Sequence, residues 1–228
     1  MVLIISTSKR KAQAISDIFY YMGVISYAAA PGEALSEIST LYRAVLVLDP
    51  DELPDAEGLV SKLRSYVSSV PIFAISDYDT SRYSDVFDAR FPDSIYSSTL
   101  VERIALYQKE RRLPIIAQYR MAGIDASCDS ERVRVFDKSI PFTKTETMIL
   151  RYLIASYPTP QSPKSIIKYA FKPSRKPEIT SIRTHVSVMN KKFREVRGRA
   201  LFVSVPKEGY TVSTPEIIKT LDESYQAV

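Results

Sequence analysis

The sequence predicts a protein in two parts. The first is an α/β half with a five-stranded parallel sheet, and the second is a half in which three helices are closed by a β-hairpin. Short apolar segments alternate with segments of helical periodicity up to residue 112. A charged junction interrupted by a proline follows at residues 108–120. Beyond it, the last segment with helical periodicity has a polar face that is strongly basic.

The composition is that of a globular protein of two ordinary domains. The chain has 228 residues, of which 45% are hydrophobic and 25% are charged. We place the domains at residues 1–112 and 113–228. No segment approaches the roughly 18 apolar residues of a membrane span, and the N-terminal apolar run precedes its basic residues, the reverse of a secretory signal. We therefore expect a cytoplasmic protein with no membrane partner.

The sequence has few of the residues that catalysis, metal binding or phosphate binding would need. There is one cysteine and one histidine, and the six glycines form no phosphate-cradling motif. No set of paired acids and no nucleophile–base pair can be assembled. We expect no catalytic residue, no bound metal and no cofactor, so the protein is not expected to be an enzyme. Cys128 is expected to be an ordinary surface thiol.

In the first half, five strands alternate with five helices, an order that predicts a doubly wound parallel sheet. The strands are predicted at 2–6, 24–29, 44–49 and 70–76, with a weak one at 91–96. The helices are predicted at 9–22, 31–40, 56–67, 81–89 and 97–112. The unbroken apolar run at 44–49 suits a strand that is covered on both faces.

Ligands of such sheets gather at the carboxyl ends of the strands. There, Asp49 follows the third strand and Ser76 the fourth. The segments VLVLDPDELPDAEGL (45–59) and VPIFAIS (70–76) resemble the receiver domain of bacterial response regulators, a flavodoxin-like fold. The resemblance implies that Asp49 is equivalent to the phosphoacceptor and Ser76 to the residue that senses the phosphoryl group.

The sequence departs from the receiver pattern around this aspartate. The family's acid pair after the first strand is replaced by Ser6 and Thr7, and its lysine after the fifth strand by Asp93 and Ser94. Mg²⁺ prefers several oxygen ligands, and a phosphoryl group adds about two negative charges. We therefore predict that Asp49 is an inactive phosphoacceptor equivalent, an inert aspartate at a strand end.

The second half is predicted to begin with short strands. These fall within 122–129, 131–137 and 138–143, and helices follow at 144–156, 162–171 and about 181–195, then a hairpin at 202–212. Thr143 or Thr145 caps the first helix, and Ser162 with Pro163 begins the second. Residues 213–228 are expected to form a short helix or a frayed tail.

Three helices closed by a hairpin make a winged helix-turn-helix, whose third helix enters the DNA major groove. In that helix Ile182, Val186, Met189 and Phe193 share one face. The opposite face carries bases and hydroxyls and no acid: Thr180, Arg183, Thr184, Ser187, Lys191 and Arg194. Charge is also uneven, with 12 basic and 15 acidic residues up to residue 112 but 19 and 11 beyond it.

Three segments resemble the effector domain of the OmpR/PhoB family of response regulators: PFTKTETMILRYLI, IRTHVSVMNKKF and LFVSVPKEGY. With the receiver-like half, the resemblance covers essentially the whole chain. It implies a homodimer formed through about residues 80–108. It also implies that the basic loop at 172–176 touches RNA polymerase or flanking DNA, the alternative being a solvated turn.

Double-stranded DNA is the expected partner. Arg183 can reach O6 and N7 of a guanine in two bonds, and Val188 can touch a thymine methyl group. Phosphates can be met by Lys191, Arg194 and the wing. The predicted DNA contacts are Thr180, Arg183, Thr184, His185, Ser187, Val188, Lys191, Arg194, Lys207 and Tyr210. The resemblance gives His185 a phosphate contact, and a packed structural histidine is the alternative.

The sequence thus favours a sequence-specific DNA-binding transcription regulator that works without phosphorylation and dimerises through its receiver-like domain. Two alternatives stay open. One is a conventional response regulator switched by phosphorylation of Asp49, and the other is a protein-interaction scaffold that does not bind DNA.

Overall fold

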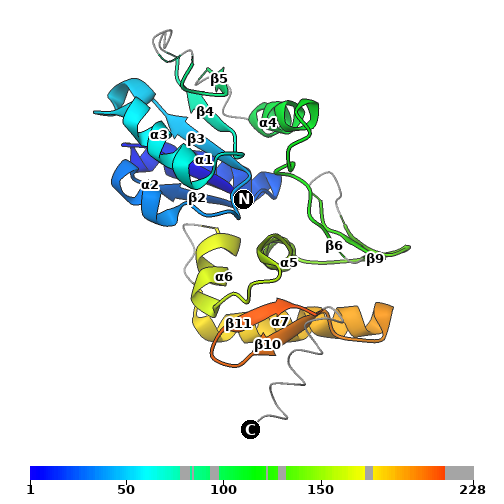
Figure 1. Cartoon of the computed structure of the whole chain (residues 1–228). Coiled ribbons are helices and arrows are strands. Elements are labelled where there is room, and N and C mark those ends of the chain that lie inside the picture. Colours follow the sequence, from blue (N-terminus) through cyan, green and yellow to red (C-terminus); the bar gives the residue numbers. More distant parts are fainter. Residues whose placement is uncertain are drawn as a thin grey trace. The chain divides into compact units, whose positions relative to one another are not determined.

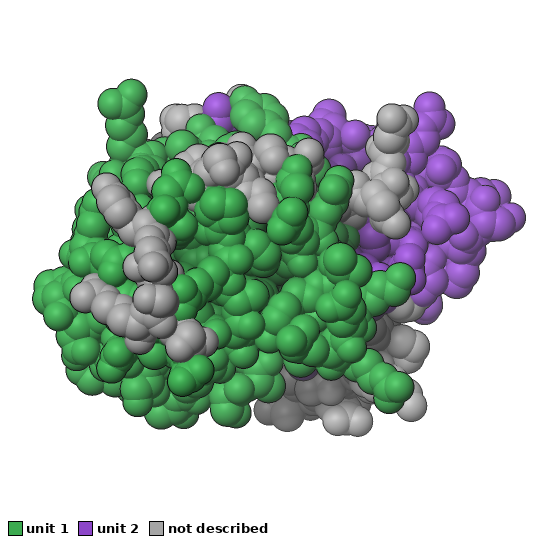
Figure 2. All heavy atoms as spheres, turned by 90° about the horizontal axis from the view of Figure 1, so that it is seen from above, with its two compact units in different colours: residues 1–117 green, residues 118–228 purple. Residues whose placement is uncertain are grey.

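The computed structural model divides the chain into two compact units, Met1–Ala117 and Gln118–Val228 (Figures 1 and 2). The residues that the structure describes are 1–77, 83, 85–92, 98–121, 123–127, 132–172 and 177–213. Outside these ranges lie Cys128, Asp93, Ser94, residues 173–176 of the basic loop and residues 214–228.

The first unit is a five-stranded parallel sheet with strand order β2-β1-β3-β4-β5. Its strands are β1 (Val2–Ile5), β2 (Ser26–Ala29), β3 (Ala44–Leu48), β4 (Ile72–Ile75) and β5 (Ala89–Phe91). Its helices are α1 (Lys9–Met22), α2 (Pro31–Glu37), α3 (Ala56–Tyr66) and α4 (Ser98–Glu110), with a 3-10 turn, η1, at Pro50–Glu52. Right-handed crossovers place helices on both faces, where α1 packs beside α4 and α2 beside α3. The doubly wound, receiver-like fold class is confirmed.

Apolar burial determines the centre of this sheet. Every residue of β1, β3 and β4 is buried, as expected for strands covered on both faces. Helix α1 has the predicted bounds because its ends are marked locally. The hydroxyl of Ser8 accepts the Lys11 N–H at 3.3 Å, and Gly23 adopts the left-handed conformation, with φ 79°, that ends the helix.

In its described residues, the predicted helix at 81–89 is wrong beyond Tyr83, and the fifth strand begins earlier than predicted. Tyr83 has 3-10 conformation, residues 85–88 form turns and bends, and β5 starts at Ala89, whereas residues 81, 82 and 84 lie outside the described residues. The cause is tertiary. The carboxylate of Asp88 accepts hydrogen bonds from the Ile72 N–H and the Arg64 guanidinium, both at 2.7 Å. These bonds hold Asp88 against the start of β4. The chain then continues as strand β5.

The first unit extends a few residues beyond α4 because buried hydrogen bonds hold the chain there. The side chain of Gln108 is fully buried, donates to the Arg43 carbonyl at 2.6 Å and accepts the Ile116 N–H at 2.9 Å. The Arg43 guanidinium donates to the Ile115 carbonyl at 2.8 Å. The segment after α4 is therefore part of the unit and not a free linker.

The described residues of the second unit form a four-stranded antiparallel sheet, three helices and a hairpin. The sheet has the order β6 (Arg120–Met121), β7 (Ile124–Asp125), β8 (Val133–Val135) and β9 (Lys138–Ile140). The helices are α5 (Lys144–Ser156), α6 (Pro163–Ala170) and α7 (Ile179–Arg197), and the hairpin is β10 (Phe202–Val205) with β11 (Gly209–Val212). Helix α6 packs on α5 and α7, and β11 packs on α5. This is the predicted winged helix-turn-helix.

Caps fix the helix starts of the second unit. Thr143, and not Thr145, caps α5. Its hydroxyl accepts the Glu146 N–H at 3.2 Å, and the Glu146 carboxylate accepts the Thr143 N–H at 2.7 Å. Ser162 caps α6 and Pro163 is its first residue, as predicted.

Candidate nucleic-acid interface

A buried stripe anchors α7 in the second unit. Ile182, Met189 and Phe193 have no exposed surface, and Val186 is 6% exposed. The ring of Phe193 packs edge-on against that of Phe202 in β10, with 5.8 Å between centroids. The predicted apolar face therefore points inward, and the opposite face of the helix is left to solvent.

A side chain that the sequence did not single out joins α7 to the hairpin. Asn190 is buried, and its amide nitrogen donates to the Phe202 carbonyl at 2.8 Å. Its amide oxygen accepts the N–H groups of Leu201 at 3.1 Å and Phe202 at 2.8 Å. Asn190 thus satisfies three buried backbone groups, and it is excluded as a reader of bases.

The adjacent lysines of α7 have different roles. Lys191 is exposed, whereas the Lys192 ammonium lies 2.8 Å from the Glu146 carboxylate and donates to the Pro141 carbonyl at 3.0 Å. Burial alone raises the pKa of the Glu146 carboxyl, but hydrogen bonds from Lys192 and the Thr143 backbone lower it by more, so the net pKa is below the ordinary value. Lys192 therefore ties α7 to the first turn of α5.

The exposed face of α7 presents the predicted DNA-reading residues together. Exposed side chains on this face are Thr180, Arg183, Thr184, Ser187, Val188, Lys191 and Arg194. No hydrogen bond or ion pair joins the side chain of Arg183, Lys191 or Arg194 to the part of the chain that the structure describes. Their charges are therefore available to an anion outside the protein.

The ends of this face hold residues that the sequence reading did not include. Ile179 is 50% exposed at the first position of the helix. Glu178 precedes it, and its carboxylate accepts the Thr180 hydroxyl at 3.3 Å. Glu195 is exposed one turn beyond Lys191, so the face is not wholly free of acids. Helical spacing alone would have located Glu195.

His185 lies at the border of the buried stripe. It is half-buried, and its ring meets that of Phe171 edge-on with 5.9 Å between centroids. It therefore packs against the protein and still reaches the surface, so its phosphate contact stays a prediction.

The wing is fixed to the unit by a close backbone approach. Lys207 is exposed at the hairpin tip, with φ 65°. Tyr210, half-buried, exchanges two backbone hydrogen bonds with Gln161, at 2.8 and 2.9 Å. Gly209 is needed beside it, because a Cβ there would lie 2.1 Å from the Gln161 carbonyl oxygen. Lys207 has no partner among the described residues.

The candidate site of the first unit contains a lysine that the sequence analysis missed. Asp49 is buried, has φ 46° and lies 2.7 Å from the Lys11 ammonium. Nearby, the Thr7 hydroxyl donates to Glu52 at 3.1 Å. Ser76 directly follows β4, and its N–H donates to the Phe91 carbonyl at 3.1 Å. An ammonium group therefore neutralises the Asp49 carboxylate.

The described residues offer neither a metal site nor a membrane-spanning helix. They contain no group of three or more His, Cys, Asp or Glu side chains arranged to hold a metal ion. No helix among them is long and apolar enough to cross a bilayer.

The fold and the site define a class of protein, a receiver-like α/β unit followed by a winged-helix unit. No family model and no curated protein matches the sequence. Solved structures similar over 93% of the chain include a RitR mutant (17% identity, 98% of that chain, TM-score 0.40) and the Thermotoga maritima OmpR/PhoB homologue DrrB (12%, 98%, 0.37). The DNA-binding domain of the response regulator AdeR, in complex with an intercistronic region, matches 42% of the chain (19% identity, 99% of that chain, TM-score 0.38). TM-scores below 0.5 add nothing to what the strand order already shows.

Asn190→Leu is expected to loosen the hairpin from α7. Three buried backbone groups would lose their partner, at a cost of about 2–4 kcal/mol. Hydrogen exchange followed by mass spectrometry should show faster exchange at Leu201 and Phe202 in the full-length protein. Lys191→Leu, at the adjacent exposed position, is the control and should leave both amides protected. Unchanged protection in Asn190→Leu would contradict the role of this side chain.

Proposed function

We propose that this chain is a sequence-specific DNA-binding transcription regulator in which the second unit, within the predicted domain 113–228, reads the major groove through α7. One observation carries the proposal: Arg183, Lys191 and Arg194 lie exposed on one face of a helix whose opposite face is fully buried. Arg183 is suited to a guanine, and Val188, 42% exposed, to a thymine methyl group.

Backbone contacts would come from the rest of the predicted set. Lys191, Arg194 and Lys207 are cations without a partner in the described structure, and each can neutralise a phosphate. Short hydroxyl donors lie among them at Thr180, Thr184 and Ser187. Such contacts position the domain, whereas base contacts select the site. We also include His185 and Tyr210 among the proposed DNA contacts. The loop at 172–176 is proposed to contact RNA polymerase or flanking DNA.

We further propose that the protein works without phosphorylation of Asp49. The Lys11 ammonium already pairs with the carboxylate at 2.7 Å, and Ser6 and Thr7 supply no carboxylate for Mg²⁺. A phosphoryl donor would have to displace this ion pair from a residue that is 1% exposed. Ser76 would then have no phosphoryl group to sense.

Dimerisation is proposed through β5 and α4 of the first unit, within the predicted domain 1–112. A surface hollow of about 360 Å³ lies there, lined by Ala89, Phe91, Arg103, Leu106, Tyr107 and Glu110. Leu106 is 55% exposed beside it, and the Arg111 guanidinium lies 3.8 Å from the centre of the Tyr107 ring. Aromatic and arginine side chains around an exposed leucine are typical of interface centres. A dimer would bind two half-sites about one helical turn apart.

Arg183→Ala and Lys191→Ala are expected to affect DNA binding in different ways. The first should weaken binding to the selected operator by about 1–3 kcal/mol and relax its sequence preference. The second should weaken binding to all duplexes alike and lower the salt slope by about one. Operators would first be selected from genomic fragments, and affinities then measured by fluorescence anisotropy over a range of salt. Equal affinity of Arg183→Ala and wild type would show that the register assigned to α7 is wrong.

Asp49→Asn is expected to leave operator affinity within about twofold of wild type, because no phosphoryl group is needed. Wild-type protein incubated with a small phosphodonor and Mg²⁺ should gain no phosphoryl mass. A conventional response regulator would gain that mass at Asp49 and change its oligomeric state.

Leu106→Asp should convert the dimer to monomer in sedimentation velocity, since it places a charge in an apolar contact. Tyr66→Asp is the matched control, because Tyr66 is 65% exposed on α3 of the same unit. A dimer that survives Leu106→Asp would exclude this surface as the interface.

A further inference from the structure

The outer face of the four-stranded sheet carries an ordered row of polar residues. The strand register pairs Arg120 with Asp125, Asp125 with Arg134, and Arg134 with Ser139. Alternation places the neighbouring Ile124 and Val135 on the inner face, where both are buried. We call Arg120, Asp125, Arg134, Phe136 and Ser139 the arginine face.

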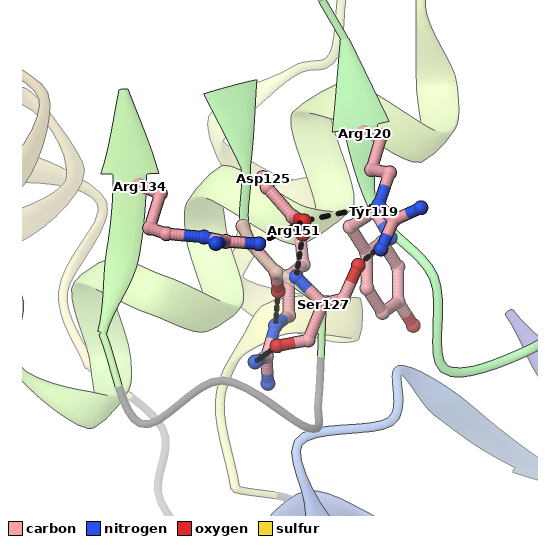
Figure 3. A network of polar contacts seen from close by, with 7 residues as sticks. Tyr119, Arg120, Asp125, Ser127, Arg134 and Arg151 are labelled. Carbon is pink, nitrogen blue, oxygen red and sulfur yellow. Dashed lines mark hydrogen bonds and ion pairs between the residues drawn. The ribbon is translucent and has the colours of Figure 1, made fainter. Parts of the chain in front are cut away.

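Asp125 gathers the two arginines (Figure 3). Its Oδ2 atom lies 3.0 Å from Arg120 Nε and 3.3 Å from an Arg134 Nη, and Figure 3 shows the guanidinium groups reaching it from either side. The arginine side chains are 58% and 61% exposed, but that of Asp125 is only 17% exposed. One carboxylate therefore orients two cations that remain open to solvent, and the group keeps a net positive charge.

The carboxylate is held in place from beneath the row (Figure 3). Asp125 Oδ1 accepts the Ser127 N–H at 3.0 Å. The buried guanidinium of Arg151 donates to the carbonyls of Ala126 and Ser127, and the Ser127 hydroxyl accepts the Tyr119 N–H at 3.2 Å. Burial raises the pKa of Asp125, but the bonds from Ser127 and the two arginines outweigh it and set the pKa at about 2. The carboxylate is therefore ionised at any physiological pH.

Most donors of the two arginines are unused. A guanidinium has five N–H groups in a planar fork that matches a carboxylate. Each arginine uses one of them on Asp125, and neither has another partner in the described part of the chain. Two oriented forks with free donors form a preorganised site for carboxylates, since little side-chain entropy is lost on binding.

An exposed aromatic side chain lies at the end of the same sheet. Phe136 is 65% exposed and has φ 55°, a conformation that is unfavourable for a bulky residue. Its ring covers Gly123, where a Cβ would lie 2.3 Å from a ring carbon. The Phe136 N–H donates to the Gly123 carbonyl at 2.7 Å. The backbone thus holds an apolar ring in water at the end of β8, the strand that carries Arg134, and exposed aromatic and arginine side chains are typical of interface anchors.

We propose that the arginine face binds an acidic segment of a partner protein, whose carboxylates pair with Arg120 and Arg134 and whose apolar side chain packs on Phe136. A nucleic acid fits less well, because the exposed ring of Phe136 has no role toward a phosphate backbone. The surface is independent of α7 and goes beyond the proposed DNA binding.

The test uses the full-length protein and a labelled synthetic peptide of glutamate, aspartate and leucine, with fluorescence anisotropy as the readout. Wild type should bind it saturably, and a peptide with glutamine and asparagine in place of the acids should not bind. The double variant R120Q/R134Q should bind at least about tenfold more weakly, since charged hydrogen bonds are lost. Phe136→Gly should also weaken binding, and its fold is safe because glycine adopts a positive φ freely.

Lys138→Gln is the matched control, an exposed cation of the same sheet outside the row, and it should change peptide affinity by less than about twofold. Operator affinity of R120Q/R134Q should equal that of wild type, which separates this proposal from DNA binding. Failure of wild type to bind the acidic peptide, or equal binding by R120Q/R134Q, would overturn the proposal. The proposal would also be overturned if duplex DNA displaced the peptide from wild type but did not lower the residual peptide binding of R120Q/R134Q at the same DNA concentration.

Discussion

The burial of one stripe of α7 is the constraint on which the C-terminal unit depends. This helix has 19 residues, and the unit packs around the side of it that carries Ile182, Met189 and Phe193. A helix can bury only one face against a small core, so fixing this stripe also fixes what faces solvent. The exposure of Arg183 and Lys191 is therefore a consequence of core packing. The hydrogen bonds of Asn190 to Leu201 and Phe202 extend the same constraint to the hairpin. The exposed face of α7 and the hairpin are therefore held in a fixed relation.

The structure separates cations that hold the fold from cations that are free. Lys192 and Arg151 both have buried partners, a carboxylate in one case and two carbonyls in the other. Burying a charge is costly unless it is paired, so these two are committed to structure. The excess of basic residues beyond residue 112 does not distinguish them from Lys191 or Arg194. Only the contacts show which of the positive charges can meet a polyanion.

Much of the fold follows from local signals. Helices α1 and α5 have the predicted bounds because the caps at Ser8 and Thr143 lie next to the residues that they satisfy. The helix prediction at 85–89 was wrong because the conformation there is set by the hydrogen bond of Asp88 to Ile72 of β4, sixteen residues away in the sequence. Asn190 and Lys11 were missed for the same reason, since their partners come from elements that only the fold brings near. Periodicity locates an exposed face, but it does not reveal which polar side chains turn inward.

The pairing of Lys11 with Asp49 shows how a side chain of the protein itself can stabilise the end of β3 in a receiver-like fold. A buried carboxylate at the end of β3 needs a positive charge close by. A bound divalent ion can supply this charge only while it stays bound, whereas a tethered ammonium on α1 is always near. The Lys11 ammonium, 2.7 Å from the Asp49 carboxylate, supplies this charge from within the chain. The end of β3 is thus tied to α1 by an ion pair, so the charge balance at this strand end is part of the fold itself.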